Sequence, residues 1–204
     1  MKWISGWAFP DSALAALDEK TSQFPMVGSW SLGSFQSLEM VMKNPRDIRA
    51  MVLVSSTARF CAAGDYAFGL AEGNLRAMQR GLTRDACGTM NSFHRLCAAP
   101  EVLDDAEIAA RMAASLALGL ETLAEGLRDL REKDFRKRVG EITSPVLLLH
   151  GEEDRVISCD ASRWLAAHLP NAKLVTLPGA GHDLPIRNSD WVAERIAEFG
   201  KEIL

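Results

Sequence analysis

Ser31 occupies a position where a serine could act as a nucleophile. It is flanked by Ser29 two residues before it and by Gly33 two residues after it. The apolar run 24–28 that precedes it is strand-like, and residues 32–42 have helical spacing. A serine at a sharp strand-to-helix turn needs small neighbours, because the turn strains its backbone and brings the flanking segments close together. The pattern predicts a nucleophile elbow at Ser31.

An aspartate and a histidine with suitable placement follow in the chain. Asp154 comes just after the apolar run 145–149, which is expected to be a strand buried on both faces. His182 follows a second apolar run, 172–177. Loops at the carboxyl ends of parallel strands converge, so the serine, aspartate and histidine are predicted to meet as a catalytic triad. Taken singly, each has a plainer reading: a helix N-cap, a turn aspartate and a surface histidine.

The three other histidines have competing interpretations. His150 ends the strand before Asp154, where support of the acid-bearing loop is the expected role. His168 falls late in the helical stretch 160–169, where a cation suits the negative end of the helix dipole. His94 lies within a helical segment and could be a core residue, a surface residue or a substrate contact.

Composition bounds the class of protein. A chain of 204 residues with 48% hydrophobic residues is expected to form one domain with an ample core. No apolar stretch approaches the roughly 20 residues that span a bilayer, and no signal peptide is expected, so a cytoplasmic protein is predicted. The net charge of −4 argues against nucleic-acid binding. The cysteines lack metal-type spacing, and neither a metal nor an organic cofactor is expected.

Strands and helices alternate along most of the chain. The expected strands are 2–5, 24–28, 48–55, 145–149 and 173–177, and the expected helices between and after them are 11–19, 32–43, 160–169 and 189–203. This alternation predicts an α/β fold, whose mostly parallel sheet of about five strands has helices on both faces.

Residues 68–132 interrupt the alternation with a wholly helical pattern. We expect them to form a helical lid, inserted into a core made of residues 1–67 and 133–204, because loops at the carboxyl ends of the strands surround the predicted site. Pro100 is expected to break this lid into two helical pairs. A separate helical domain is the alternative, although the stretch is short for independent folding.

With these residues in place, the chain resembles the α/β-hydrolase family. Within it, the likeness is to the BioH-type carboxylesterases, which demethylate pimeloyl-acyl-carrier-protein methyl ester. The matching motifs extend over nearly the whole chain: Ser5-Gly6-Trp7, Trp30-Ser31-Leu32-Gly33, Leu53-Val54-Ser55-Ser56, Gly119-Leu120-Glu121-Thr122-Leu123, Arg128-Asp129-Leu130-Arg131, 151–154 and Gly181-His182.

Three features depart from the family pattern. Ser5 stands where the family usually has histidine, and Ser29 and Ser34 stand where it usually has glycine. The segment between Trp7 and Ser31 is also unusually short. The resemblance therefore implies that strands at the front of the sheet are absent and that the strand before the first-loop motif lies at an edge.

The resemblance implies a serine-hydrolase mechanism. His182 would take the proton of Ser31, and Asp154 would orient the imidazole. The backbone N–H groups of Trp7 and Leu32 would form the oxyanion hole. The reaction would require no cofactor.

Arginines in the predicted lid suggest an anionic partner. Arg76, Arg80 and Arg84 recur at four-residue intervals, and Arg95 follows nearby. Like charges aligned on one helical face repel each other unless an anion meets them. An acyl-carrier protein with its phosphopantetheine arm would fit, because arginine binds phosphate and carboxylate through paired hydrogen bonds. A solvated helix face is the plainer alternative.

Several large apolar residues could line a pocket for an acyl chain. They are Trp7, Trp30, Phe68, Leu32 and Met90, and each could equally be core packing.

Three functions stay open at this point. The first is a serine carboxylesterase that hydrolyses the methyl ester of pimeloyl-acyl-carrier protein in biotin synthesis. The others are a broad esterase or thioesterase for short acyl groups, and a catalytically silent binding protein with a hydrolase fold.

Overall fold

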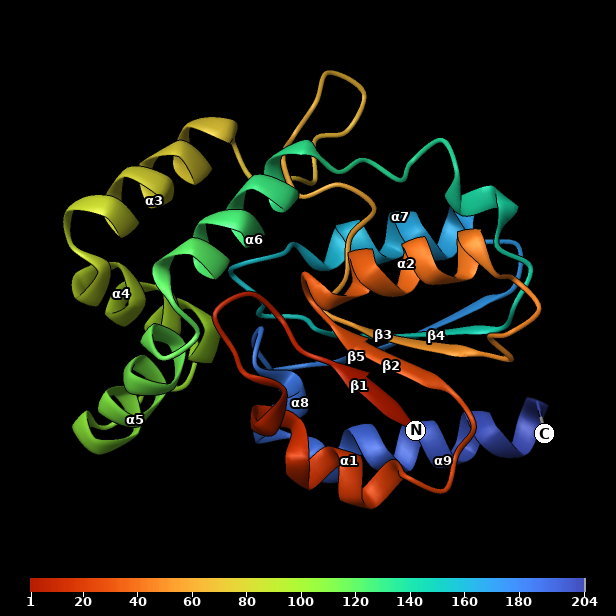
Figure 1. Ribbon diagram of the computed structural model, residues 1–204. Helices are drawn as coiled ribbons and strands as arrows, with labels where there is room; N and C mark the ends of the chain where they lie inside the picture. The colour runs from red at the N-terminus through yellow and green to blue at the C-terminus, as the bar shows by residue number, and fades with distance from the viewer. Residues whose placement is uncertain (204) are drawn as a thin grey trace.

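Five parallel strands form the centre of the computed structural model, which describes residues 1–203 (Figure 1). The strands are β1 (Lys2–Ile4), β2 (Val27–Trp30), β3 (Met51–Val54), β4 (Val146–Gly151) and β5 (Ala172–Leu177). Their order in the sheet is β1-β2-β3-β4-β5, and every neighbouring pair is parallel. This confirms the predicted α/β fold, with β1 at one edge of the sheet.

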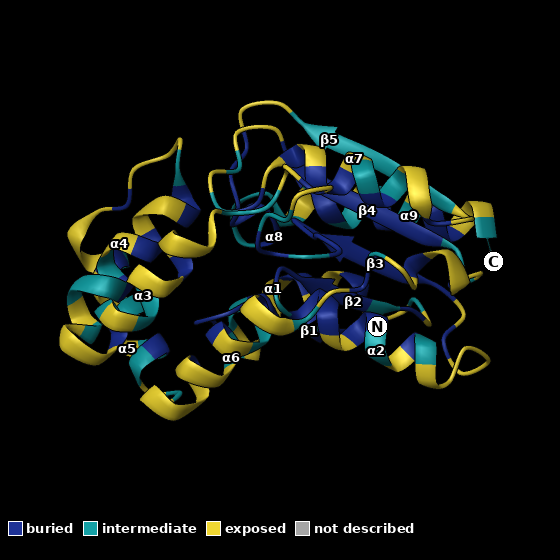
Figure 2. Ribbon diagram, turned by 90° about the horizontal axis from the view of Figure 1, so that it is seen from above, coloured by how far each residue is buried: buried dark blue, intermediate teal, exposed yellow. Residues whose placement is uncertain are grey.

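The central strands are continuous apolar runs because both of their faces are covered. Every residue of β3 and β4 is buried, and Leu53 pairs in register with Leu148. Figure 2 shows these strands in dark blue, whereas β5 at the other edge is only half-buried. Burial on both faces is the usual reason for apolar runs without alternation in parallel sheets.

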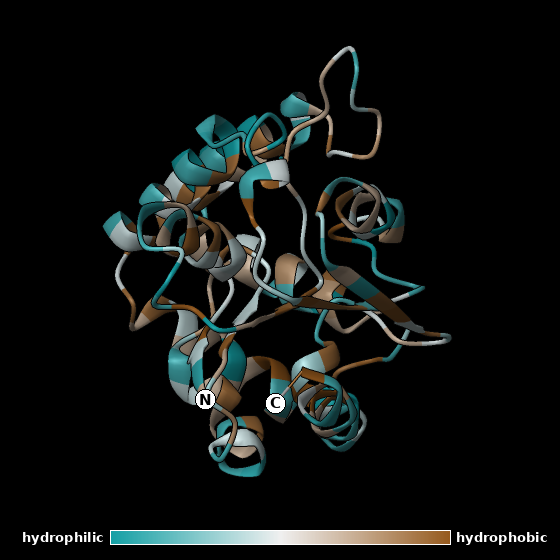
Figure 3. Ribbon diagram, turned by 90° about the vertical axis from the view of Figure 1, so that its right-hand side faces the viewer, coloured by the Kyte–Doolittle hydropathy of each residue, from teal (hydrophilic) through white to brown (hydrophobic). Residues whose placement is uncertain are grey.

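Helices cover both faces of the sheet (Figure 1). One face carries α2 (Gly33–Lys43) and α7 (Cys159–His168). The other carries α1 (Ala15–Thr21), the short α8 (Leu184–Arg187) and α9 (Ser189–Ile203), with the 3-10 turn η1 (Asp11–Leu14) leading into α1. A second 3-10 turn, η2 (Val139–Glu141), precedes β4. In Figure 3 hydrophobic strands lie between helices whose outward faces are hydrophilic, as amphipathic packing requires.

Four further helices lie beyond the carboxyl ends of the strands, at the left of Figure 1. They are α3 (Glu72–Arg84), α4 (Ala86–Ala98), α5 (Asp105–Leu116) and α6 (Leu120–Glu132). We call these four helices the helical insertion. Asp85 ends α3 and caps α4, since its Oδ1 accepts a hydrogen bond from the Gly88 N–H at 2.9 Å. Pro100 lies between α4 and α5, with two helices of the insertion on each side of it in the chain. In space, however, α4 packs against α5 and α6 packs against α3, so the helices do not form two separate pairs.

The insertion shares the hydrophobic core of the sheet. Leu75, Met90, Leu123 and Leu127 are fully buried and belong to one continuous cluster with the apolar residues of the strands. A smaller cluster around Leu103 fills the space between α4 and α5. A continuous core favours a single domain over a separately folded helical one.

Some element boundaries differ from the expectations. The strand β2 begins at Val27 rather than at Phe24, because Phe24 closes a turn in which its N–H donates to the Thr21 carbonyl at 3.0 Å, and Pro25 has no N–H to offer a neighbouring strand. Helix α8 is not predicted by the sequence, since a single turn leaves too short a pattern. None of the helices in residues 1–203 has the length and apolar character that a bilayer span requires.

Candidate active site

Ser31 sits on a strained turn between β2 and α2. Its φ is 54°, in the left-handed region that non-glycine residues seldom adopt, and its N–H donates to the Val54 carbonyl at 3.0 Å. Gly33 allows this turn, because a Cβ there would overlap the carbonyls of Ile4 and Ser5 on the neighbouring chain segment. Only 8% of Ser31 is exposed. The geometry is that of a nucleophile elbow.

Three side chains from distant parts of the chain form one hydrogen-bonded line. His182 Nε2 lies 3.0 Å from Ser31 Oγ, and His182 Nδ1 lies 2.8 Å from Asp154 Oδ2. A carboxylate can only accept, so Nδ1 carries the imidazole proton and Nε2 is left to accept from the serine hydroxyl. This is the tautomer that a general base requires.

Asp154 is held by donors on both of its oxygens. Oδ1 accepts the backbone N–H groups of Val156 at 2.8 Å and Ile157 at 2.9 Å, and the side chain has no exposed surface. Burial by itself would raise the pKa of Asp154. Attraction to His182 and hydrogen bonds from His150 and His182 outweigh burial, so the pKa lies below its ordinary value. The Asp154 carboxylate is therefore ionised at neutral pH and can accept the hydrogen bond of His182.

His150 supports the loop that carries Asp154. It is fully buried at the end of β4, with Nδ1 2.7 Å from Ser162 Oγ and Nε2 3.0 Å from the Ile157 carbonyl. Its Nε2 is also 3.2 Å from Asp154 Oδ2. These contacts agree with the supporting role expected from its position in the sequence.

Two residues beside Ser31 have backbone N–H groups for which the described residues offer no backbone acceptor. They are Leu32, which follows the serine at the start of α2, and Trp7, in the loop after β1. The Trp7 ring is fixed by a 2.8 Å hydrogen bond from Nε1 to the Leu123 carbonyl of α6. The pair fits the expected oxyanion hole, a role that stays a prediction.

A small apolar cavity of about 40 Å³ opens beside Ser31. Residues of the sheet side and of the insertion line it together: Trp7, Phe60, Leu70, Met78, Phe93, Leu96, Leu130, Val156 and Arg155. Phe60, Leu70 and Phe93 were not predicted from the sequence, because nothing in their local pattern distinguishes a pocket wall from core packing. A larger groove of about 740 Å³ lies between α3 and α4 and shares Met78, Phe93 and Leu96 with the cavity.

Four of the five expected acyl contacts do not line this cavity. Leu32 lines another depression, together with Trp7 and Gly126. Trp30 has no exposed surface, and its Nε1 donates to the His182 carbonyl at 2.9 Å, so it supports the histidine loop and the expectation that it contacts substrate is wrong. Met90 is a fully buried core residue. Phe68 is 39% exposed and does not line the cavity; it lines a neighbouring depression that shares Leu70, Arg155 and Val156 with the cavity. Whether each residue lines the cavity depends on the direction of its side chain, which a sequence pattern does not specify.

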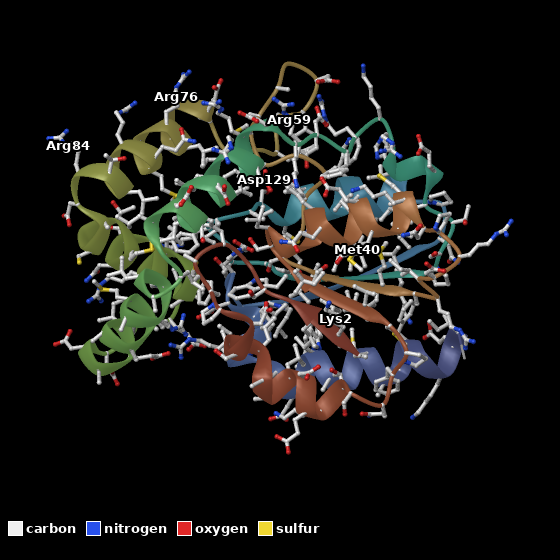
Figure 4. The ribbon with its side chains drawn as sticks, viewed as in Figure 1. Lys2, Met40, Arg59, Arg76, Arg84 and Asp129 are labelled. Atoms are coloured by element: carbon white, nitrogen blue, oxygen red, sulfur yellow. The ribbon has the colours of Figure 1, made fainter. Side chains whose placement is uncertain are left out.

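The four predicted arginines do not form one site. Arg80 and Arg84 line the groove between α3 and α4. Arg76 is paired with Glu72 at 3.3 Å on its own helix. Arg95 donates to Asn91 at 2.8 Å and lies 4.0 Å from Asp105, at the contact between α4 and α5. Figure 4 shows Arg76 and Arg84 projecting outward from α3.

His94 is a buried, neutral residue rather than a surface one. It has no exposed surface, its Nε2 lies 2.7 Å from Ser115 Oγ, and its Nδ1 has no partner among the described residues. Burial, followed by the nearby charge of Arg111, lowers the pKa of His94 to about 4. Between about pH 6.5 and 4 the unfolded chain therefore binds a proton that the folded protein does not.

We expect acidification to destabilise the protein through His94. The contribution of neutral His94 to the free energy of unfolding is fully present above about pH 6.5 and is lost as the pH drops toward 4. The loss amounts to about 2 kcal/mol between pH 7.5 and 5.0. Urea unfolding of the wild type and of His94→Gln at these two pH values measures it. The variant should lose about 2 kcal/mol less than the wild type over the same interval. Equal losses in the two proteins would contradict the assignment.

Comparisons with known proteins agree with this geometry. The sequence profile of the family described as serine aminopeptidase, S33, matches residues 13–187. A pimeloyl-[acyl-carrier protein] methyl ester esterase of Nitrosomonas europaea is 32% identical over 183 residues, which are 84% of this chain and 72% of that protein. A protein of the same name from Aromatoleum aromaticum is 28% identical over 188 residues, covering 86% of this chain and 72% of that protein.

Solved structures show the same fold. The esterase EaEST from Exiguobacterium antarcticum superposes with a TM-score of 0.81 at 15% identity, covering 93% of this chain and 72% of that one. A thermophilic esterase superposes with a TM-score of 0.78 at 18% identity, covering 98% and 89%. The family match and the relative at 32% identity establish the family of the chain in addition to its fold. The chain belongs to the serine aminopeptidase S33 family of α/β-hydrolases and is a carboxylic ester hydrolase.

Proposed function

We propose that this enzyme hydrolyses the methyl ester of pimeloyl-acyl-carrier protein, with Ser31, His182 and Asp154 as its catalytic triad. The observation that carries the proposal is the hydrogen-bonded line of these side chains, at 3.0 and 2.8 Å, beside an apolar cavity. The names of the relatives from Nitrosomonas europaea and Aromatoleum aromaticum support the substrate.

The reaction would proceed in two halves. His182 Nε2 takes the proton of Ser31 as Oγ attacks the ester carbonyl, and the N–H groups of Trp7 and Leu32 stabilise the oxyanion. The imidazolium then returns the proton to the departing methoxide, so methanol leaves and an acyl-enzyme remains. In the second half, His182 takes a proton from water as water attacks the acyl carbon. The imidazolium then returns that proton to Ser31 Oγ as the bond between Oγ and the acyl carbon breaks, and the acid product is released.

The cavity and the groove together would accommodate a long acyl chain. The cavity of about 40 Å³ beside Ser31 is small and apolar, which suits a small group such as the methyl ester. Met78, Phe93 and Leu96 form the wall that the cavity shares with the groove of about 740 Å³. We infer that the acyl chain of the substrate runs from the cavity along these three side chains into the groove. The helical insertion would act as the lid over the cavity.

Arg80 and Arg84 would meet the carrier at the outer end of this route. Both line the groove, and neither has a carboxylate within ion-pair distance among the described residues. An unpaired guanidinium binds a phosphodiester or a surface carboxylate of an acidic protein through paired, charge-assisted hydrogen bonds. Arg76 and Arg95 already have partners in the protein, so they are weaker candidates.

Charge reversal of the groove tests the carrier. We expect Arg80→Glu with Arg84→Glu to raise KM for the carrier-linked ester at least about tenfold, because attraction to an acidic partner becomes repulsion. KM for p-nitrophenyl acetate should stay unchanged. The matched control is Arg128→Glu on α6, an exposed arginine that pairs with Glu125. Steady-state kinetics on both substrates provide the measurement.

A second candidate function follows from the size of the cavity. About 40 Å³ suits an acetyl or propionyl group, which is the substrate class of a broad short-acyl esterase or thioesterase. An unchanged KM for the carrier-linked ester in the reversed double variant would favour this second function. So would a kcat/KM that falls steadily as the free acyl methyl ester is lengthened from two to seven carbons.

A further inference from the structure

Helix α5 of the insertion presents two buried polar side chains on one face. Arg111 and Ser115 are four residues apart, so they lie one above the other on the helix. The Arg111 side chain is only 10% exposed, and Ser115 has no exposed surface. Each contacts a different loop at the carboxyl end of the sheet, and these are the two loops that flank Ser31.

Arg111 contacts the loop that carries His182. Its Nη1 donates to Asp183 Oδ2 at 2.8 Å, and Asp183 directly follows the histidine. Its Nη2 donates to Glu107 Oε1 at 3.0 Å. Arg187 of α8 donates to the same two carboxylates, at 3.3 Å to Asp183 and 2.7 Å to Glu107. The loop is thereby connected to α5 by a closed network of charged hydrogen bonds.

Asp183 needs this network because it is buried. Its side chain is 2% exposed, and burial raises its pKa even though Arg111 and Arg187 oppose the rise. Its N–H also donates to the Cys97 carbonyl of α4 at 3.2 Å. On the other side of the loop, Trp30 holds the His182 carbonyl. The insertion and the sheet therefore fix the position of the histidine from opposite sides.

Ser115 contacts the loop that carries Trp7. Its Oγ lies 2.5 Å from the Ala8 carbonyl and 3.0 Å from the Arg111 carbonyl one turn earlier in α5, and the shorter contact makes Ala8 the main acceptor of the hydroxyl proton. Ala8 adopts a φ of 64°. A non-glycine residue in this region of backbone space is strained and needs its surroundings to hold it. Ser115 has one proton to give, so His94 must donate through Nε2 to Ser115 Oγ, 2.7 Å away. His94 thereby orients the hydroxyl toward the loop.

We propose that α5 braces the active site, with Arg111 positioning His182 through Asp183, and Ser115 positioning the Trp7 amide through Ala8. Both are positioning residues, since neither reaches Ser31 or the cavity. The insertion would then do more than cover the site: it would fix the distances between general base, nucleophile and oxyanion donors. This inference rests on the proposed triad and not on the identity of the acyl carrier.

Two variants test the brace on p-nitrophenyl acetate, an ester that needs no carrier. We expect Arg111→Gln to lower kcat about 10- to 100-fold and Ser115→Ala to lower it about tenfold, with KM changed less than about threefold, because a displacement of about 1 Å is costly to catalysis. Fluorophosphonate labelling of Ser31 should slow by similar factors. The control is Arg128→Gln, which removes an exposed insertion arginine and should leave kcat unchanged.

Measurements at 25 °C and thermal unfolding of each variant separate positioning from stability. Arg111→Lys keeps the charge beside Asp183 if Arg111→Gln fails to fold, and it should show a smaller loss of kcat. Folded variants whose Ser31-dependent kcat stays within about threefold of wild type, whatever their Tm, would overturn the brace and leave the triad intact. Full activity in Ser31→Ala would overturn the triad and the brace together.

Discussion

Ser31→Ala should lower kcat by at least about 10⁴-fold on every ester that the enzyme hydrolyses, because alanine lacks the hydroxyl that would accept the acyl group. His182 Nε2 faces Ser31 Oγ at 3.0 Å, so the alanine variant leaves the base with nothing to deprotonate except water. KM should change little, since the cavity walls are untouched. Single-turnover and steady-state kinetics, with fluorophosphonate labelling, provide the measurement.

Ser34→Ala is the matched control for this experiment. Ser34 lies one turn further along α2, is fully buried, and its hydroxyl has no hydrogen-bond partner among the described residues. Removing that hydroxyl should leave kcat unchanged and cost no stability. If Ser31→Ala retained more than about a tenth of the wild-type kcat, or still reacted with the probe, another residue would be the nucleophile.

Asp154→Asn should lower kcat about 10⁴-fold by forcing the wrong tautomer on His182. Two backbone donors, from Val156 and Ile157, require an oxygen at the Oδ1 position, so the new amide nitrogen must take the place of Oδ2. An NH₂ group donates, and His182 Nδ1 would then have to accept. The imidazole proton would move to Nε2, where it points at Ser31 and prevents proton abstraction.

The control for this variant is Asp160→Asn, which changes an exposed aspartate at the start of α7 that pairs with Arg163. It should leave kcat within about twofold of wild type, as expected of a surface ion pair. The wild-type pKa of Asp154 lies below its ordinary value, so acid loss of activity between pH 7 and 5 reports a group other than this carboxylate. A kcat for Asp154→Asn within tenfold of wild type would show that the carboxylate does not fix the tautomer.

Local sequence patterns determined the sheet and the candidate triad. The apolar runs of β3 and β4 have no alternation because both faces are covered, and this property is visible in the sequence itself. Ser31 is recognisable because a sharp turn demands small residues at fixed neighbouring positions. Asp154 and His182 could be placed because the ends of parallel strands meet at one edge of the sheet. Each inference depends on residues only a few positions apart, together with one topological rule.

Contacts between distant segments were decided by the tertiary structure alone. Trp30 directly precedes Ser31, so the sequence offered it as a possible substrate contact. In the structure its ring points inward and donates a hydrogen bond to the His182 carbonyl. Arg111 and Ser115 show nothing unusual in the sequence of α5, but packing of that helix places them against two active-site loops. The physical reason is that side-chain direction and helix docking depend on the whole core. A pattern of neighbouring residues specifies which face of a helix is buried but not which loop that face will meet.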